Sequence, residues 1–350
     1  MRIVIFNPFK YIQLRGIPKY TSELAEALVN DGHQVIEVTW PVRMAHCPRF
    51  IIAPLFICHQ QLVFPFYGMF LRPDLVIESY NSYSIIIALM FHVVCVYHDF
   101  VPFFSPRWFL KPSALYQRLL HKIIFLMPKI QIFCVSPRIV NEVKKFIKYN
   151  GKINILPNAI KPLGSVPGEF DGSGELISEC EHFKSLGFII LTTISGEGSN
   201  KNISGLIDAL RALELNVFLI AFGFSEASKN ELKYTGVNES ILIVKVVGPV
   251  TGLTMSRVIR FGDLFIFHSL SEGFGRPVAE ALLEGNIVIT DDIPAVQMLS
   301  AGALKNVIVC NVTTDLLPSM NLALKSKFEP FDELLEVPLK QVIHIVEEIL

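Results

Sequence analysis

Two glutamates, Glu272 and Glu280, are joined by a glycine-rich segment in SEGFGRPVAEALLEG, residues 271–285. Gly273 and Gly275 let backbone N–H groups approach a ligand closely. Carboxylates are poor ligands for phosphate but good hydrogen-bond acceptors for hydroxyl groups, so two of them suit a ligand with two separate hydroxyl-bearing ends. The alternative is that the glycines only make a turn and that Glu280 only complements a helix dipole.

A strand and a helix are expected on the two sides of this loop. The apolar run DLFIFHS ends near Ser269, and Pro277 can occupy the first helical position because its missing N–H costs nothing there. Gly285 suits the C-terminal cap, so we expect a loop at 272–275 and a helix at about 277–284. The N-terminus of such a helix favours negatively charged groups such as phosphate.

Apolar, strand-like runs alternate with helical patterns along the whole chain, beginning with RIVIF and the helical pattern at 17–30. This alternation predicts parallel βαβ units and doubly wound sheets of the α/β class. The pattern restarts after a polar, glycine-containing stretch. We therefore expect an N-terminal Rossmann-like domain at 1–161, an interdomain region at 162–187 and a C-terminal Rossmann-like domain at 188–350, with a last helix that is expected to pack back on the first domain.

Composition limits the class of protein. With 350 residues, 51% hydrophobic and 18% charged, the chain suits two well-buried domains. The six cysteines are scattered without a C-x-x-C pair, which favours a reducing compartment and no zinc site. The start, MRIVIFNPF, lacks the features of a signal peptide. We expect a cytoplasmic protein.

Charge is divided unevenly. Residues 1–161 hold 18 Lys and Arg against 8 Asp and Glu, whereas the remainder holds 13 against 24. The segment 103–122 interleaves aromatic and basic side chains, which is typical of an anionic membrane surface rather than of nucleic acid; a lid or core helix with a solvated basic edge is the alternative. The apolar stretch 50–71 is interrupted by Pro54, by residues 59–61 and by Pro65, so we expect a shallow apolar surface and no membrane span.

A histidine and an aspartate end another predicted strand, in VVCVYHDFVP. In open α/β sheets, ligands bind at the carboxyl ends of the strands. The imidazole of His98 can hydrogen-bond a sugar hydroxyl there, and Asp99 can orient that ring or cap the next turn. An ordinary strand-end histidine is the alternative. A metal pair would need further ligands, and none is suitably spaced, so no metal is expected.

The segment 272–280 resembles the E-x7-E element of retaining GT-B glycosyltransferases, especially those of glycosyltransferase family 4. The Gly-Phe-Gly-x-Pro filling, which includes Phe274, is the one usual in that family. The resemblance implies a GT-B fold, with two Rossmann-like domains facing a central cleft. It implies that Glu272 contacts the donor sugar, that Glu280 binds the ribose hydroxyls, and that the backbone N–H groups of residues 273–275 face the sugar. His98 would lie near the donor's sugar ring.

Two further segments repeat the resemblance with departures. In RGIPKY, Arg15-Gly16 replaces the family's usual glycine pair; Gly16 would offer its N–H to the donor phosphates, and Arg15 would add charge or crowd the acceptor side. In LTTISGEGSNKN, Lys201 would neutralise the diphosphate. The arginine that relatives carry upstream of that lysine is absent between Leu191 and Lys201. Its place would be taken by other polar residues, for which the candidates are Ser195, Ser199, Asn200 and Arg276.

The residues and the resemblance together predict a retaining, metal-independent hexosyltransferase. It would use a UDP- or GDP-sugar, without any cofactor, on a saccharide or lipid-linked saccharide in bacterial-type surface polysaccharide assembly, peripheral on the inner face of the membrane. The first alternative is a catalytically degenerate GT-B protein that binds a membrane or partner. The second, a dinucleotide-binding oxidoreductase, would need G-x-G-x-x-G after the first strand, where this chain has only Gly16.

Overall fold

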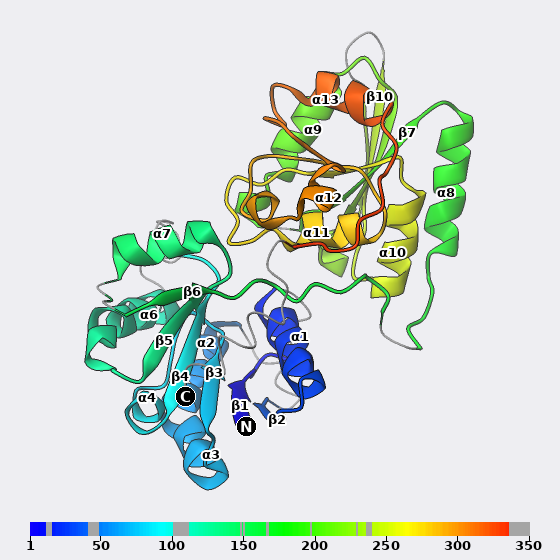
Figure 1. Ribbon diagram of the computed structural model, residues 1–350. Helices are drawn as coiled ribbons and strands as arrows, with labels where there is room; N and C mark the ends of the chain where they lie inside the picture. Colours follow the sequence, from blue (N-terminus) through cyan, green and yellow to red (C-terminus); the bar gives the residue numbers. More distant parts are fainter. Residues whose placement is uncertain are drawn as a thin grey trace. The chain divides into compact units, whose positions relative to one another are not determined.

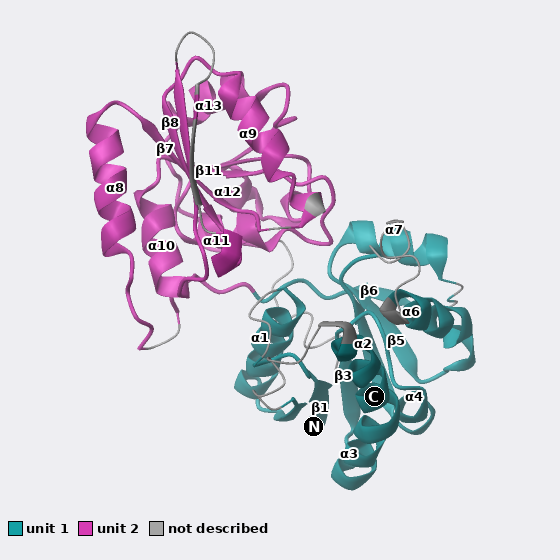
Figure 2. Ribbon diagram, turned by 180° about the vertical axis from the view of Figure 1, so that it is seen from behind, with its two compact units in different colours: residues 1–159, 337–350 teal, residues 160–336 magenta. Residues whose placement is uncertain are grey.

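Figure 1 shows the computed structural model of the chain. It describes residues 1–350 except 12–15, 41–48, 101–111, 148, 150, 166–167, 197, 229, 236–239 and 336–350. The chain divides into two compact units, here called unit 1 (residues 1–159) and unit 2 (residues 160–336), which are coloured separately in Figure 2. The final helix expected from the sequence lies outside the described residues.

Unit 1 is built on a six-stranded, all-parallel sheet with the order β2-β1-β3-β4-β5-β6. Its strands are β1 (Arg2–Phe6), β2 (Gln34–Val38), β3 (Leu75–Glu78), β4 (His92–Tyr97), β5 (Ile130–Cys134) and β6 (Ile153–Ile155). The central strands β3 and β4 are buried almost throughout, as expected for a sheet covered by helices on both faces. The parallel register places the ends of β1, β3 and β4 at the same edge of the sheet.

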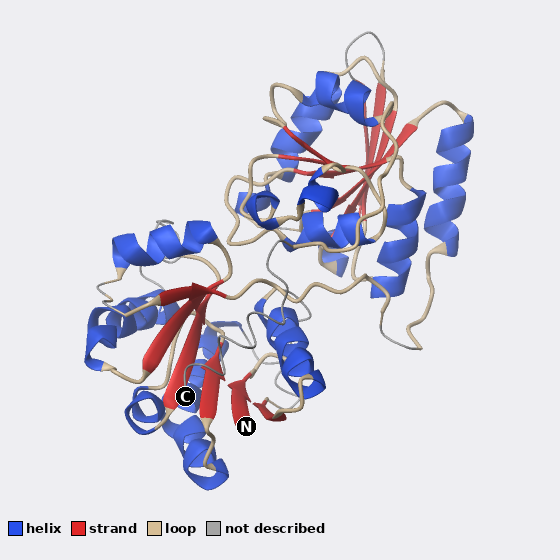
Figure 3. Ribbon diagram, in the orientation of Figure 1, coloured by secondary structure: helices blue, strands red, loops and turns tan. Residues whose placement is uncertain are grey.

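Helices connect these strands, as Figure 3 shows. They are α1 (Ile17–Asn30), α2 (Arg49–Cys58), the π-helical turn η2 (His59–Val63), α3 (Phe64–Leu71), α4 (Ile85–Met90), α6 (Pro112–Ile123), η3 (Ile124–Leu126) and α7 (Pro137–Phe146). The hydroxyl of Ser136 caps α7 by accepting from the N–H of Ile139 at 3.4 Å.

The stretch 50–71 differs from expectation, because it forms one helical run through α2, η2 and α3. Pro54 lies inside α2, and Pro65 lies in the first turn of α3, directly after the π-helical turn η2. Within the described residues, the run Ile51–Leu71 is long and apolar enough to cross a membrane by length and composition.

Unit 2 is built on a seven-stranded sheet with the order β13-β12-β11-β7-β8-β10-β9. Its strands are β7 (Ile189–Ile194), β8 (Val217–Phe222), β9 (Asn230–Thr235), β10 (Ile241–Val246), β11 (Leu264–Phe267), β12 (Val288–Thr290) and β13 (Val307–Val309). All neighbouring pairs are parallel except β9, which runs antiparallel to β10 at the edge. Buried aliphatic side chains on β7, β8, β10 and β11 form one core with those of α9 and α13.

The helical elements of unit 2 are α8 (Gly174–Ser185), η4 (Ser199–Lys201), α9 (Ile203–Arg211), η5 (Glu226–Ser228), α10 (Gly252–Phe261), α11 (Arg276–Leu283), η7 (Val296–Met298), α12 (Ala301–Leu304) and α13 (Leu316–Ala323). The stretch expected between the domains thus carries α8, which contacts β7 and α10 of unit 2. Gly285 follows α11 with φ of 81°, the left-handed conformation that suits a helix C-terminus. Two doubly wound sheets with flanking helices confirm the predicted fold class.

Candidate active site

Two loops meet at the carboxyl edge of the sheet of unit 2. One follows β7 and leads through η4 into α9, and the other follows β11 and leads into α11. Because β7 and β11 are hydrogen-bonded neighbours in parallel register, both loops leave the sheet at the same edge. The sequence placed Lys201 on the first loop and Glu272 on the second, and the structure brings these two side chains together.

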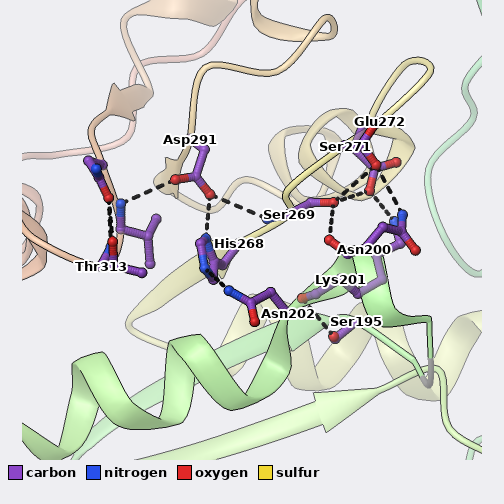
Figure 4. Close-up of polar contacts among 12 residues, drawn as sticks. Ser195, Asn200, Lys201, Asn202, His268, Ser269, Ser271, Glu272, Asp291 and Thr313 are labelled. Atoms are coloured by element: carbon purple, nitrogen blue, oxygen red, sulfur yellow. Dashed lines mark hydrogen bonds and ion pairs between the residues drawn. The ribbon is translucent and has the colours of Figure 1, made fainter. Parts of the chain in front are cut away.

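The ammonium group of Lys201 forms an ion pair with Glu272, with 2.6 Å between Nζ and Oε1 (Figure 4). The same carboxylate oxygen accepts a hydrogen bond of 2.6 Å from the hydroxyl of Ser269. Lys201 Nζ also lies 4.8 Å from the ring centroid of Phe267, a cation–π distance. Both charged side chains are largely buried, so their attraction is less screened than it would be on the surface.

Hydrogen bonds to backbone carbonyl groups connect the two loops. The side-chain amide of Asn200 donates to the carbonyl of Ser271 at 3.0 Å, and the carbonyl of Asn200 accepts from the N–H of Leu270 at 2.7 Å and from Ser269 Oγ at 3.0 Å. Ser195 Oγ donates to the carbonyl of Lys201 at 3.4 Å. Of the accessory residues predicted from the sequence, Ser195 and Asn200 therefore shape the loop around the lysine.

A histidine–aspartate pair that the sequence did not suggest as functional contacts this loop through Asn202. His268 Nδ1 lies 2.6 Å from Asp291 Oδ2, and His268 Nε2 lies 2.7 Å from the amide nitrogen of Asn202. These contacts fit a ring whose Nδ1–H donates to the carboxylate while Nε2 accepts from the amide. Asn202 is left-handed with φ of 37°, a conformation that asparagine tolerates better than most residues. The sequence did carry one signal for this pair: His268 and Asp291 are polar residues that directly follow two buried strands.

The glycine-rich loop requires glycine at one position. Gly275 has φ of 104°, and a Cβ there would lie 2.3 Å from Ile293 Cδ1. It is the residue before α11, so the first N–H groups of that helix are not covered by a capping side chain. Phe274 is buried, which fixes the loop, while Gly273 is half-buried.

The second glutamate of the pair, Glu280, lies one turn into α11. It is nearly buried, and its Oε1 is 3.3 Å from a guanidinium nitrogen of Arg276. Arg276 was a sequence candidate for the missing cation, and the structure shows that it faces this glutamate. Each glutamate of the E-x7-E element thus has its own cation within unit 2.

The remaining predicted residues belong to unit 1. His98 follows β4; its backbone N–H donates to Asn81 Oδ1 at 2.7 Å, and its ring meets Tyr20 edge-on with centroids 4.6 Å apart. Asp99 follows it and is half-buried. Gly16, with φ of 50°, directly precedes α1. Arg15 lies outside the described residues.

This geometry can hold an anionic group bearing hydroxyls. Lys201, the open N-terminus of α11 and the N–H groups of the glycine loop offer positive potential, and Glu272 and Glu280 offer hydroxyl acceptors. An incoming phosphate would compete with Glu272 for the lysine, because both are anions. The arrangement therefore suits a phosphorylated sugar better than a purely apolar or purely cationic ligand.

Comparisons with known proteins fit the two-sheet architecture. No protein-family model matches the sequence, and no curated protein matches it. Among solved structures, sucrose-phosphate synthase from Thermosynechococcus elongatus aligns with a TM-score of 0.63 at 13% identity, over 92% of this chain and 88% of that one. HepE from Anabaena, in complex with UDP-glucose, aligns with a TM-score of 0.56 at 16% identity, over 93% and 90%.

The glycosyltransferase WaaG, involved in lipopolysaccharide biosynthesis, aligns with a TM-score of 0.57 at 14% identity, again over 93% and 90%. All three similarities cover both units. The chain has the GT-B fold. In this chain Gly16 lies between β1 and α1, and the loop 272–275 lies between β11 and α11.

Proposed function

We propose that this GT-B protein is a retaining, metal-independent hexosyltransferase similar to those of glycosyltransferase family 4. It transfers a sugar from a UDP- or GDP-sugar to a hydroxyl of a saccharide or lipid-linked saccharide, without a cofactor. The observation that carries the proposal is the meeting of Lys201 and Glu272 at the edge where α11, with Glu280, begins. HepE, which shares the fold, was solved with UDP-glucose, which supports a nucleotide-sugar donor.

Each residue then has a role in binding or in charge stabilisation. Glu280 accepts hydrogen bonds from the ribose hydroxyls, and Glu272 accepts them from the donor sugar. Lys201, together with the N–H groups of the loop 273–275, stabilises the negative charge that develops on the leaving diphosphate. His98, with Asp99 beside it, contacts the sugar. Gly16 offers its N–H to the donor phosphates, and Arg15 adds charge or crowds the acceptor side.

The reaction breaks the bond between the anomeric carbon and the diphosphate oxygen through an oxocarbenium-like state, and the acceptor oxygen bonds to the same face. The acceptor's proton passes to the departing phosphate, so no separate protein base is required. Holding donor and acceptor in this geometry supplies the rest of the rate enhancement. Lys201 stabilises the reacting complex most at the stage when the negative charge on the leaving phosphate is greatest.

The biological setting is proposed from the acceptor side. WaaG, with the same fold, takes part in lipopolysaccharide biosynthesis, which supports surface polysaccharide assembly. The basic and aromatic composition of residues 1–161 supports a cytoplasmic enzyme that is peripheral on an anionic membrane.

One observation favours a second candidate, a catalytically degenerate GT-B protein that binds a membrane or a partner. Both site cations of unit 2 are held by the site's own glutamates, Lys201 by Glu272 and Arg276 by Glu280. No arginine precedes Lys201 after Leu191. A donor phosphate would compete with these glutamates for the two cations.

Calorimetric titration with UDP and GDP separates the candidates. We expect saturable binding of one nucleotide, weakened about tenfold or more by Glu280→Ala because the ribose loses its acceptor. Glu175→Ala is the matched control, since Glu175 is an exposed acid in the first turn of α8 of the same unit. If neither nucleotide bound, the degenerate candidate would replace the enzyme.

Product analysis tests the finer part of the proposal. With the nucleotide that binds, the corresponding sugar nucleotides and saccharide acceptors are screened for transfer. The anomeric coupling of the product is then read by NMR, and the assay is repeated with EDTA. A product of inverted configuration, or activity lost to EDTA and restored by a divalent cation, would contradict the retaining, metal-independent assignment.

A further inference from the structure

The helical run α2–η2–α3 of unit 1 turns polar as well as apolar side chains inward and leaves several large apolar side chains exposed. The run α2–η2–α3 carries no charged residue between Arg49 and Arg72. Only 22% of its most apolar part, within 51–71, is buried. A helix that packs on a sheet normally turns its apolar side inward, so this exposure needs an explanation.

The polar residues of the run are directed into the unit. Gln60 Nε2 donates to Glu78 Oε2 at 2.6 Å, and Tyr116 OH donates to Gln60 Oε1 at 2.7 Å. Gln61 Nε2 donates to the carbonyl of Tyr83 at 2.8 Å. Burial raises the pKa of Glu78 to about 8, so its carboxyl is neutral at physiological pH. These bonds fix which side of the run faces the sheet.

The opposite side of the run is apolar and exposed. Phe70 is 87% exposed and Phe66 is 70% exposed, although both are large aromatic residues. The neighbouring α4 and α6–η3 add further exposed apolar residues; α4 packs against α3, and α6 against α2. Together they form what we call the outer apolar face: Leu62, Val63, Phe66, Tyr67, Met69, Phe70, Ile86, Leu89, Met90, Leu115, Leu119, Phe125 and Leu126.

Cations gather where the helices of this face end. The guanidinium of Arg2 donates to the carbonyl of Leu71 at 2.8 Å, and Lys129 Nζ donates to the carbonyl of Met90 at 2.9 Å. Arg72 and Lys122 are also exposed, at the ends of α3 and α6. Between residues 49 and 134 the chain has three acidic residues, Asp74, Glu78 and Asp99. They do not fully offset the positive charge of these cations.

We propose that the outer apolar face inserts into one leaflet of an anionic bilayer, with these cations at the headgroups. An apolar surface bordered by Arg and Lys is complementary to acyl chains beneath anionic headgroups, where both contributions add. A patch of this kind seldom remains exposed on a soluble monomer. The face includes part of the stretch 50–71, for which the sequence indicated a shallow apolar surface, and it does not include the aromatic residues at 103–109.

The run lies in the surface and does not span the bilayer. Its inner side is committed to unit 1 through Gln60 and through Gly68, where a Cβ would lie 2.3 Å from Ile87 Cδ1. Phe64 is fully buried on the same side. A spanning helix would have to abandon these contacts and leave the polar groups of unit 1 unpaired, which is costly.

Vesicle flotation of the full-length protein tests the proposal. With vesicles of phosphatidylcholine and phosphatidylglycerol we expect binding that Phe66→Ser/Phe70→Ser weakens about tenfold or more, because two anchors are lost. The matched control is Phe170→Ser/Leu322→Ser, which removes a phenylalanine of 78% exposure and a leucine of 58% exposure from unit 2 and should leave binding unchanged. Arg72→Gln/Lys122→Gln should weaken binding to anionic vesicles and leave the weak binding to pure phosphatidylcholine unaltered.

Depth and oligomeric state complete the test. Phe70→Trp should show fluorescence quenching by lipids brominated near the headgroup and less by lipids brominated near the chain ends. Quenching strongest at the chain ends, with resistance to alkaline extraction, would overturn one-leaflet insertion in favour of a span. Absence of vesicle binding by the folded wild type would overturn the proposal. A dimer that Phe66→Ser/Phe70→Ser converts to monomer would then assign the face to a second copy.

Discussion

Each unit buries a glutamate completely, and the two units neutralise it differently. In unit 2 the carboxylate of Glu284 lies 2.7 Å from Arg260 Nε and accepts from Ser256 Oγ and from the N–H of Leu163, each at 2.6 Å. In unit 1, among the residues that the structure describes, the carboxyl of Glu78 accepts from uncharged donors only, Gln60 Nε2 at 2.6 Å and the N–H of Ser84 at 2.8 Å. Burial without a cation raises the pKa of Glu78 to about 8.

The difference shows how each unit manages charge. Unit 2 pairs charge with charge, as also in Lys201–Glu272 and Arg276–Glu280, and so keeps ions ready for an anionic ligand. Unit 1 also has ion pairs, such as Lys10–Glu37, but its fully buried Glu78 is kept protonated. Replacing one partner of a buried ion pair leaves the other charge buried without its partner, which destabilises the fold. Replacing a buried acid that has no cation with a neutral group removes the cost of burying its charge.

The largest effect should come from breaking the pair in the candidate active site. Lys201→Met removes the cation that faces the diphosphate, and we expect glycosyl transfer to fall about 10²- to 10³-fold. Lys184→Met is the control, because Lys184 pairs with Asp263 at 2.5 Å at a more exposed place in the same unit. Steady-state transfer assays measure both variants. Wild-type rates in Lys201→Met would remove the lysine from the mechanism.

Glu284→Gln should destabilise the protein by about 2 kcal/mol, because a fully buried carboxylate loses its ion pair while its other donors remain. The half-exposed guanidinium of Arg260 can turn to water, which limits the loss. Urea unfolding monitored by circular dichroism gives the free energy of unfolding. An unchanged midpoint would mean that Arg260 contributes nothing to the stability of unit 2.

Glu78→Gln should have the opposite sign and depend on pH. In the wild type, the stabilisation due to the protonated carboxyl is complete below its unfolded pKa, near 4.5, and is lost as pH rises to about 8. The variant lacks this dependence, so it should match the wild type near pH 4.5 and exceed it by about 4 kcal/mol at pH 7.5, at about 1.4 kcal/mol for each of the three pH units. Urea unfolding at both pH values checks this. A variant less stable at pH 7.5 would mean that the carboxyl is ionised in the folded protein.

The fold was largely predictable because apolar runs bounded by turns specify buried strands. The helix at 17–30 and the strand RIVIF coincide with α1 and β1. The antiparallel edge strand β9 was missed, since NELKYT is polar and lacks the apolar run that marked the other strands; it pairs with β10, the next strand in the chain. The helical continuity of 50–71 was missed because prolines normally interrupt helices, whereas here Pro54 lies inside α2 and Pro65 lies in the first turn of α3.

The site was predictable where residue type and spacing were sufficient. The loop at 272–275 and the Pro277-containing helix were anticipated, because glycine and proline specify local backbone directly. The pair His268–Asp291 was not, since its two members come from different strands and only the sheet order brings them together. Which cation faces which glutamate depends on rotamers, which a sequence does not reveal.

The π-helical turn η2 determines which side of α3 faces the sheet and which side faces outward. Here the N–H of Phe64 bonds to the carbonyl of His59, five residues back, so the turn holds one residue more than an α-helix would. Deleting one residue from 59–63 would restore an ordinary α-turn and rotate α3 by about 100° relative to α2. This rotation would turn the buried side of α3 outward, and Phe66 and Phe70 would then no longer lie at the surface. A change of length by a single codon can therefore decide what this edge of the molecule presents to its surroundings.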